Sequence, residues 1–174
     1  MKNLRILLFL LPLLAGCRKI DAGFDMTYRR TFTIPVGWNP IETFRIVFAD
    51  TPVDSAVFFQ ANNISSDKVG QIVPRSMTIR PVFNGDGDLG FVRKVEAAIF
   101  DSQLTPSSEQ IVFYNDEVRL TNGGQIMLIP LNVDVRKKFL SGNGRYRMQI
   151  KMYFIGITSR SYDVEWNAVF LAKT

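Results

Sequence analysis

The sequence predicts an all-β protein, an antiparallel β-sandwich of about eight strands with one short helix. Apolar and polar residues alternate over several separate segments, which is the period of a strand with one buried face. Pro, Gly, Asn and Asp recur roughly every dozen residues and separate these segments with turns. A helical period is found in a single stretch near residue 135.

The expected strands follow one another along the chain and are rich in aromatic and β-branched residues. We expect them over 24–34, 43–48, 69–82, 91–100, 110–114, 125–131, 146–154 and 162–170. The pattern resembles an immunoglobulin-like sandwich in architecture alone, because the cysteine pair of true immunoglobulin domains is missing.

Two segments leave their structure open. Residues 56–60 suit either a strand or a short helical turn. Residues 69–82 suit two short strands or one bent strand, because Pro74 and Pro81 interrupt them. Proline cannot donate to a strand ladder, so any strand here is expected at an edge or to start after a proline.

The best helix candidate begins after Asp134, whose carboxylate can cap the first turn. Val135 and Phe139 lie four residues apart and therefore share one helix face. Gly142 suits the end of the helix. We expect two turns at most.

The last two expected strands show the clearest alternation in the chain. Their apolar faces include Ile150 in the first strand and Trp166 in the second, which we expect in the core. We expect the two strands to pair as a hairpin, with Lys151 opposite Glu165 or Asp163 on the solvent face.

The first seventeen residues have the organisation of a secretory signal peptide. Lys2 and Arg5 are basic, residues 6–14 are almost wholly apolar, and small side chains precede Cys17. The apolar run of about 10 residues is too short for a ~30 Å hydrocarbon core, which needs ~20 residues. Leu14-Ala15-Gly16-Cys17 resembles the lipobox of bacterial lipoproteins. That resemblance implies that Cys17 is lipidated and becomes the first mature residue.

This resemblance divides the chain into a signal peptide over 1–16, a lipidated tether over 17–23 and one domain over 24–174. Arg18 and Lys19 follow the cysteine, where lipoproteins kept in the inner membrane often carry aspartate. The expected address is therefore the outer membrane of a Gram-negative bacterium, on its periplasmic face. Exposure on the cell surface is the alternative.

Composition restricts the classes of function. The net charge of +5 falls to +3 without Lys2 and Arg5. Such a small positive charge does not indicate a nucleic-acid-binding protein. The chain has no histidine, and its single cysteine is assigned to the anchor. Ser-His and Cys-His nucleophile systems are thereby excluded, and we expect no enzyme, cofactor or metal centre.

One glycine-rich segment has part of a calcium-loop pattern. Asn84, Asp86 and Asp88 have the odd-position spacing that begins such a loop. Leu89 then stands where the loop needs glycine, and Val95 where it needs a bidentate glutamate. We expect a turn between strands and no specific calcium site.

Three other short features have two interpretations each. Asp54-Ser55-Ala56 resembles a bacterial O-glycosylation signal, although three residues match often by chance. Asn63-Ile64-Ser65 matches the N-glycosylation acceptor, which a bacterial host rarely uses. Trp38, between Gly37 and Pro40, suits a plug at the end of the core or an exposed aromatic in a sugar-binding loop.

The leading functional expectation is a lipid-anchored, non-catalytic protein-interaction module of the cell envelope. Its partners would be the membrane, through the anchor, and a protein. The alternative is a lipoprotein that captures a glycan, for which Trp38 is the candidate ligand-binding residue, or an apolar small molecule. A bare edge strand would favour a protein partner.

Overall fold

The computed structural model describes residues 23–52, 55–83, 88–100, 108–118, 124–140 and 145–174. These residues form an all-β protein whose strands pair antiparallel, which confirms the predicted class. The strands are β1 (Gly23–Ile34), β2 (Phe44–Pro52), β3 (Gln71–Pro81), β4 (Val92–Phe100), β5 (Gln110–Asn115), β6 (Ile126–Pro130), β7 (Arg145–Phe154) and β8 (Tyr162–Lys173).

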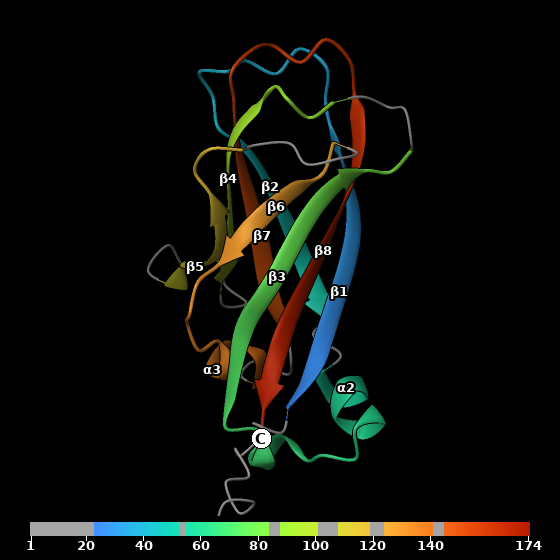
Figure 1. Ribbon diagram of the computed structural model, residues 1–174, viewed down its shortest axis with the longest axis vertical. Helices are drawn as coiled ribbons and strands as arrows, with labels where there is room; N and C mark the ends of the chain where they lie inside the picture. The colour runs from blue at the N-terminus through green and yellow to red at the C-terminus, as the bar shows by residue number, and fades with distance from the viewer. Residues whose placement is uncertain (1–22, 53–54, 84–87, 101–107, 119–123, 141–144) are drawn as a thin grey trace, which may run out of the picture.

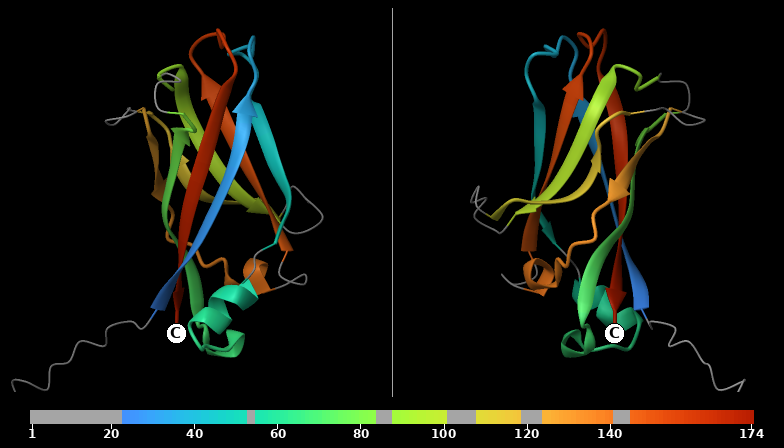
Figure 2. Two further views of the ribbon diagram at one scale, coloured as in Figure 1. Left: turned by 90° about the vertical axis from the view of Figure 1, so that its right-hand side faces the viewer. Right: turned by 60° about the vertical axis from the view of Figure 1, so that its left-hand side comes forward.

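The eight strands make one curled sheet in the order β1-β8-β3-β6-β5-β4-β7-β2. The sheet wraps around the core as an open half-barrel (Figure 1; Figure 2). Its two halves are joined where β5 meets β6, and that ladder consists of Phe113 opposite Pro130 and Tyr114 opposite Ile129. The first and last strands of the order, β1 and β2, are the free edges.

The predicted hairpin between the last two strands is wrong. β7 pairs with β2 and β4, whereas β8 pairs with β1 and β3. Lys151 consequently bonds Glu109 rather than Glu165, and Glu165 accepts from Arg80. The assigned faces are nevertheless correct, because Ile150 and Trp166 are fully buried. Alternation fixes which side of a strand is buried and leaves its hydrogen-bonding partner open.

β3 is one strand in the interior of the sheet, which corrects the expected edge position. It carries Pro74 opposite Phe170 of β8, and the ladder shifts register between Pro74 and Ser76. On its other side β3 pairs with β6 over Met77–Ile79 alone. The proline is tolerated because it stands beyond the short β6 and beside an irregularity in the β8 ladder.

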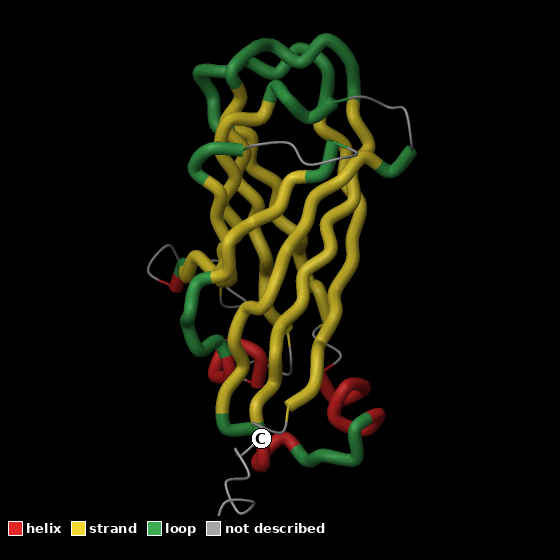
Figure 3. The backbone as a smooth tube through the Cα atoms, viewed as in Figure 1, coloured by secondary structure: helices red, strands yellow, loops and turns green. Residues whose placement is uncertain are grey.

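Among the described residues there are two α-helices, where one was expected (Figure 3). The segment left open is helical: α2 (Ser55–Ala61) buries Phe59 and precedes a 3-10 turn at Ser66–Lys68. Asn63 follows the end of α2 and has φ 53°, the left-handed conformation that asparagine tolerates. None of the described helices is long and apolar enough to cross a bilayer.

The predicted helix is present as α3 (Arg136–Leu140), with Val135 and Phe139 fully buried. Asp134 Oδ1 accepts the N–H of Arg136 at 2.9 Å and the N–H of Ile72 at 3.0 Å. One carboxylate therefore caps the helix and joins it to β3.

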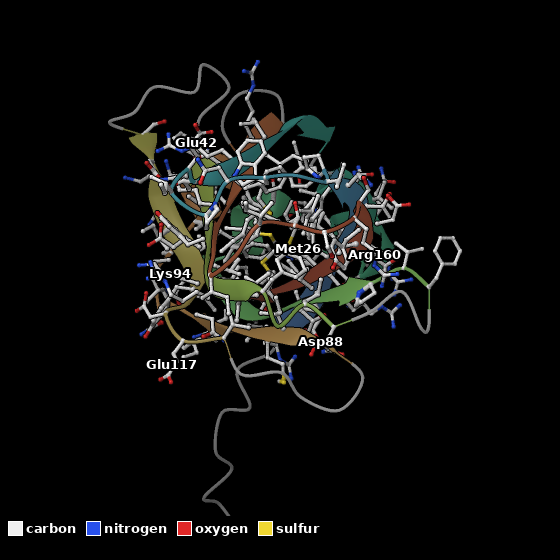
Figure 4. The ribbon with its side chains drawn as sticks, turned by 90° about the horizontal axis from the view of Figure 1, so that it is seen from above. Met26, Glu42, Asp88, Lys94, Glu117 and Arg160 are labelled. Atoms are coloured by element: carbon white, nitrogen blue, oxygen red, sulfur yellow. The ribbon has the colours of Figure 1, made fainter. Side chains whose placement is uncertain are left out.

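The core combines aliphatic side chains with a connected set of aromatic rings. Phe170 contacts Phe139 at 4.9 Å and Phe113 at 5.4 Å between ring centroids, and it lies 6.0 Å from Tyr28. Seen from above, Met26 lies in the middle of the ring of strands (Figure 4). Since no disulfide is available, this packing is what stabilises the fold.

The two edge strands face each other without pairing. We call the line between β1 residues 28–34 and β2 residues 44–48 the seam; the left view of Figure 2 looks onto it. The Cα traces of the two strands stay more than 8 Å apart over almost all of their length. Phe32 of β1 crosses the seam to Phe44 and Phe48 of β2, at ring distances of 6.4 and 5.8 Å.

Candidate functional site

Two loops meet at the end of the half-barrel opposite the start of β1 (Figure 1). One joins β1 to β2 over residues 35–43, and the other joins β7 to β8 over residues 155–161. Both connections are short and come from strands on opposite halves of the sheet. Their meeting closes this end of the core.

Thr158 holds the two loops together. Its side chain is almost fully buried, and Oγ1 accepts the N–H of Trp38 at 2.9 Å and donates to the carbonyl of Pro35 at 2.7 Å. The Thr158 carbonyl also accepts the N–H of Gly37 at 2.8 Å. Gly37 has φ +78°, which a residue with a side chain adopts only under strain.

Four aliphatic side chains project from these loops into solvent. Ile41 is 90 % exposed, Ile157 69 %, Ile155 66 % and Val36 59 %. We call these four residues the apolar tip. Single exposed apolar residues are ordinary on a protein surface, but four on two adjoining loops form a candidate contact site.

The end of β3 extends this apolar surface. Val82 and Phe83 follow β3 directly and are 41 % and 60 % exposed. The N–H of Val82 donates to the carbonyl of Asp163, which places the pair at the end of the barrel where β8 begins. Val82 and Phe83 are thus a second exposed apolar segment near the start of β8.

Trp38 lies beneath the apolar tip. Its ring is half buried, meets Phe44 edge-on at 5.0 Å, and donates its indole N–H to the carbonyl of Glu42 at 3.1 Å. The tryptophan therefore packs down onto the core and fixes the conformation of the loop.

Charged residues surround this end of the barrel. Figure 4 shows Glu42, Asp88, Lys94, Glu117 and Arg160 around its rim. The Arg160 guanidinium lies 5.1 Å above the ring of Tyr162. An apolar centre with a polar rim is the usual anatomy of an interaction surface.

The best-defined charged cluster forms ion pairs on the outer face of the sheet. The Lys94 ammonium lies 2.8 Å from Asp116 and 2.9 Å from Glu96, and hydrogen bonds to Asp116 and then to Glu96 hold the pKa of Lys94 well above its ordinary value. Both carboxylates are therefore engaged. Within the described parts of the chain, no three carboxylate or thiol side chains gather as a metal site.

Several residues singled out from the sequence lie outside the described residues. They are the signal-peptide residues and Cys17, the following Arg18 and Lys19, and Asp54, Asn84, Asp86 and Gly142. Their described neighbours take ordinary roles: Ser55 begins α2, and Asp88 accepts the N–H of Gly90 at 2.8 Å.

The four residues of the apolar tip were not predicted from the sequence. Their signal is an apolar residue inside each turn: Val36 and Ile41 flank Gly37 and Pro40, and Ile155 and Ile157 flank Gly156. An apolar residue in a turn can fold back onto the core or stay exposed as part of a contact surface. The sequence alone does not distinguish burial from exposure.

Comparison with known proteins does not assign the chain to a family. No family model matches it, and no curated protein does. Two structures of turnip yellow mosaic virus align with 88 % and 87 % of this chain and with 94 % and 95 % of theirs. Their identities are 10 % and 12 %, and their TM-scores are 0.31 and 0.28. The decameric BFDV capsid protein aligns with 88 % of this chain and 99 % of its own, at 14 % identity and TM-score 0.35. Scores this low carry no conclusion about fold or function.

Proposed function

We propose that this chain is a lipid-anchored lipoprotein of a bacterial outer membrane that binds a protein partner without catalysing a reaction. The observation that carries the proposal is the apolar tip, at the end of the half-barrel opposite the start of β1. The address proposed is the periplasmic face of the outer membrane.

The anchor is assigned to Cys17, by its resemblance to a lipobox cysteine. Gly23 begins β1 six residues later (23 − 17 = 6), so the tether is short. Each buried methylene contributes ~0.8 kcal/mol, and two acyl chains hold a protein stably on a bilayer. The 12 residues of β1 rise ~3.3 Å each, which separates the anchored end from the tip by about 40 Å.

A protein partner is favoured over a glycan by the composition of the tip. Its exposed groups are aliphatic, whereas Trp38, the aromatic that would stack on a sugar, is half buried against Phe44. In this proposal the two halves of the curled sheet serve as the facing layers of an immunoglobulin-like sandwich. The loops at one end of such layers form the contact surface.

Affinity purification from detergent-solubilised membranes tests the proposal when wild type is compared with two double variants. Ile41→Asp with Ile157→Asp places charges in the apolar tip. The matched control, Met127→Asp with Ile129→Asp, alters apolar residues of β6 that are 54 % and 52 % exposed. A specific partner should be lost with the tip variant and retained with the control. Equal retention by both variants would refute the tip as the binding surface.

A further inference from the structure

Arg30 interrupts the apolar face of β1. Residues 24, 26, 28, 32 and 34 of this face are buried, but Arg30 is exposed. Its position faces inward, because its Cα partner on β8 is the fully buried Trp166 and opposed residues of a ladder point to the same side. The arginine side chain therefore leaves the interior through the seam.

The indole of Trp166 lies beneath the seam with an unused donor. The ring contacts Phe48 of the opposite edge strand at 5.4 Å, so it bridges from β8 to β2 below the position of Arg30. Its Nε1 is fully buried and, like Asn167 Oδ1, has no hydrogen-bond partner among the described residues. Because a buried N–H without an acceptor is costly, a ligand that brings an acceptor to this point would gain binding energy from it.

The backbones that border the seam are also unpaired on one side. β1 pairs with β8 alone and β2 with β7 alone, so each strand leaves one row of N–H and C=O groups facing the seam. An inserted strand needs roughly 9.6 Å between its two neighbours, twice the usual spacing. The Cα traces of β1 and β2 stand more than 8 Å apart over almost all of their length and diverge away from the loop that joins them (Figure 2), so no existing ladder has to break to admit a strand.

Uncompensated positive charge lies along the seam. The Arg30 guanidinium donates to the carbonyl of Arg29 and, among the described residues, meets no carboxylate. Arg45, on the solvent face of β2, likewise has no acidic partner in the described parts of the chain. Arg29 is compensated, because it lies 3.6 Å from Glu165.

We propose that the seam is a binding site for an extended peptide strand of a protein partner, one that carries an acidic side chain. The peptide backbone would pair with the free edges of β1 and β2. Its carboxylate would bind Arg30, and an acceptor on the strand would take the N–H of Trp166. This site is separate from the apolar tip and does not depend on it.

Two synthetic heptapeptides test the proposal, Thr-Val-Thr-Glu-Thr-Val-Thr and a twin with Lys in place of Glu. Binding is followed in the full domain by calorimetry, and by Trp166 fluorescence in a Trp38→Phe background, where Trp166 is the one remaining tryptophan. We expect the Glu peptide to bind at least tenfold more tightly than the Lys twin. Its binding should shift Trp166 emission to longer wavelength and slow amide exchange in β1 and β2.

A charge reversal at Arg30 gives the decisive comparison. Arg30→Glu should reverse the preference, so that the Lys peptide binds more tightly. Arg93→Glu, at an exposed arginine of β4 away from the seam, should leave the preference unchanged. Calorimetry on the wild-type chain needs no variant, so a folding defect in Arg30→Glu leaves the proposal testable.

Several results would overturn the proposal. They are absence of binding for both peptides at millimolar concentration, equal binding of the twins, and a preference that survives Arg30→Glu. Dodecanoate provides a last comparison. If this anionic lipid shifts Trp166 emission in an Arg30-dependent way and the Glu peptide does not, the seam takes an amphiphile and the peptide proposal is wrong.

Discussion

Arg30 and Trp166 oppose each other in the β1–β8 ladder, yet the arginine is exposed and the indole fully buried. The pair separates two aromatic contacts of β1, that of Phe32 with Phe48 above and that of Tyr28 with Phe58 of α2 below. A charge at an inward position of an edge strand discourages indiscriminate strand pairing.

Replacement of the central tryptophan should strongly destabilise the fold. Trp166→Ala removes a fully buried ring that packs on Phe48, and large-to-small core changes of this kind cost about 3–5 kcal/mol. Denaturant unfolding measures the loss. Met127→Ala, at an exposed site, should change stability by less than about 0.5 kcal/mol. A Trp166→Ala domain as stable as wild type would mean that the inward face of β8 is misassigned.

The loops of the apolar tip should depend on one hydroxyl. Thr158→Val keeps the shape of the side chain but leaves the Trp38 N–H and the Pro35 carbonyl without their buried partner, at a cost of about 1–3 kcal/mol. The melting temperature should fall, and amide exchange at Trp38 should quicken. Ser159→Ala, an exposed neighbour, serves as the control and should change neither.

A second single-residue link joins α3 to β3. Asp134→Ala deprives the N–H groups of Arg136 and Ile72 of a shared acceptor, which should cost about 1–2 kcal/mol. Asn132→Ala, exposed two residues earlier, should be near neutral. The joining role is refuted if hydrogen exchange at Ile72 is unchanged by Asp134→Ala.

Lys94 gives the fold a defined response to alkaline pH. Its pKa is raised in the folded protein, so the stability it contributes is complete below the ordinary lysine value of 10.5 and is lost as pH rises through the folded value. The stability difference between wild type and Lys94→Gln should therefore stay constant from pH 7 to about pH 10 and shrink above it. Urea unfolding at several pH values measures this difference. A gap that widens with pH would contradict the assigned ion pairs.

The sequence predicted which face of each strand is buried better than it predicted which strands pair. Alternation placed Trp166 and Ile150 inside correctly, because burial of one face has period two and needs no knowledge of the partner strand. Pairing is a property of the whole chain. The expected opposition of Lys151 and Glu165 therefore failed, since the loop over 155–161 crosses between the two halves of the sheet instead of closing a hairpin.

The candidate site was harder to predict than the fold. Trp38 was recognisable because a tryptophan between turn residues is unusual, but the structure places it below the surface that Ile41 and Ile157 form. Arg30 lies on the otherwise apolar face of β1, and its exposure follows from the edge position of that strand. Edge positions follow from strand order, which local sequence does not specify.

The proposed lipid anchor makes a separate prediction about processing. Cys17→Ala should leave an uncleaved precursor that incorporates no labelled fatty acid, whereas wild type should be acylated. External protease should spare the wild-type protein in intact cells and digest it once the outer membrane is breached. Digestion in intact cells would place the protein on the cell surface.

Photo-crosslinking in living cells tests the central claim, that an anchored domain presents its apolar tip to a protein, most directly. Benzoylphenylalanine is placed at position 157 in the tip or, as a control, at the exposed position 129 on β6, in wild-type and Cys17→Ala backgrounds. The account predicts one discrete crosslinked protein from position 157 alone, lost when Cys17 is replaced. No adduct from position 157, the same adducts from position 129, or an adduct that persists without Cys17 would contradict it.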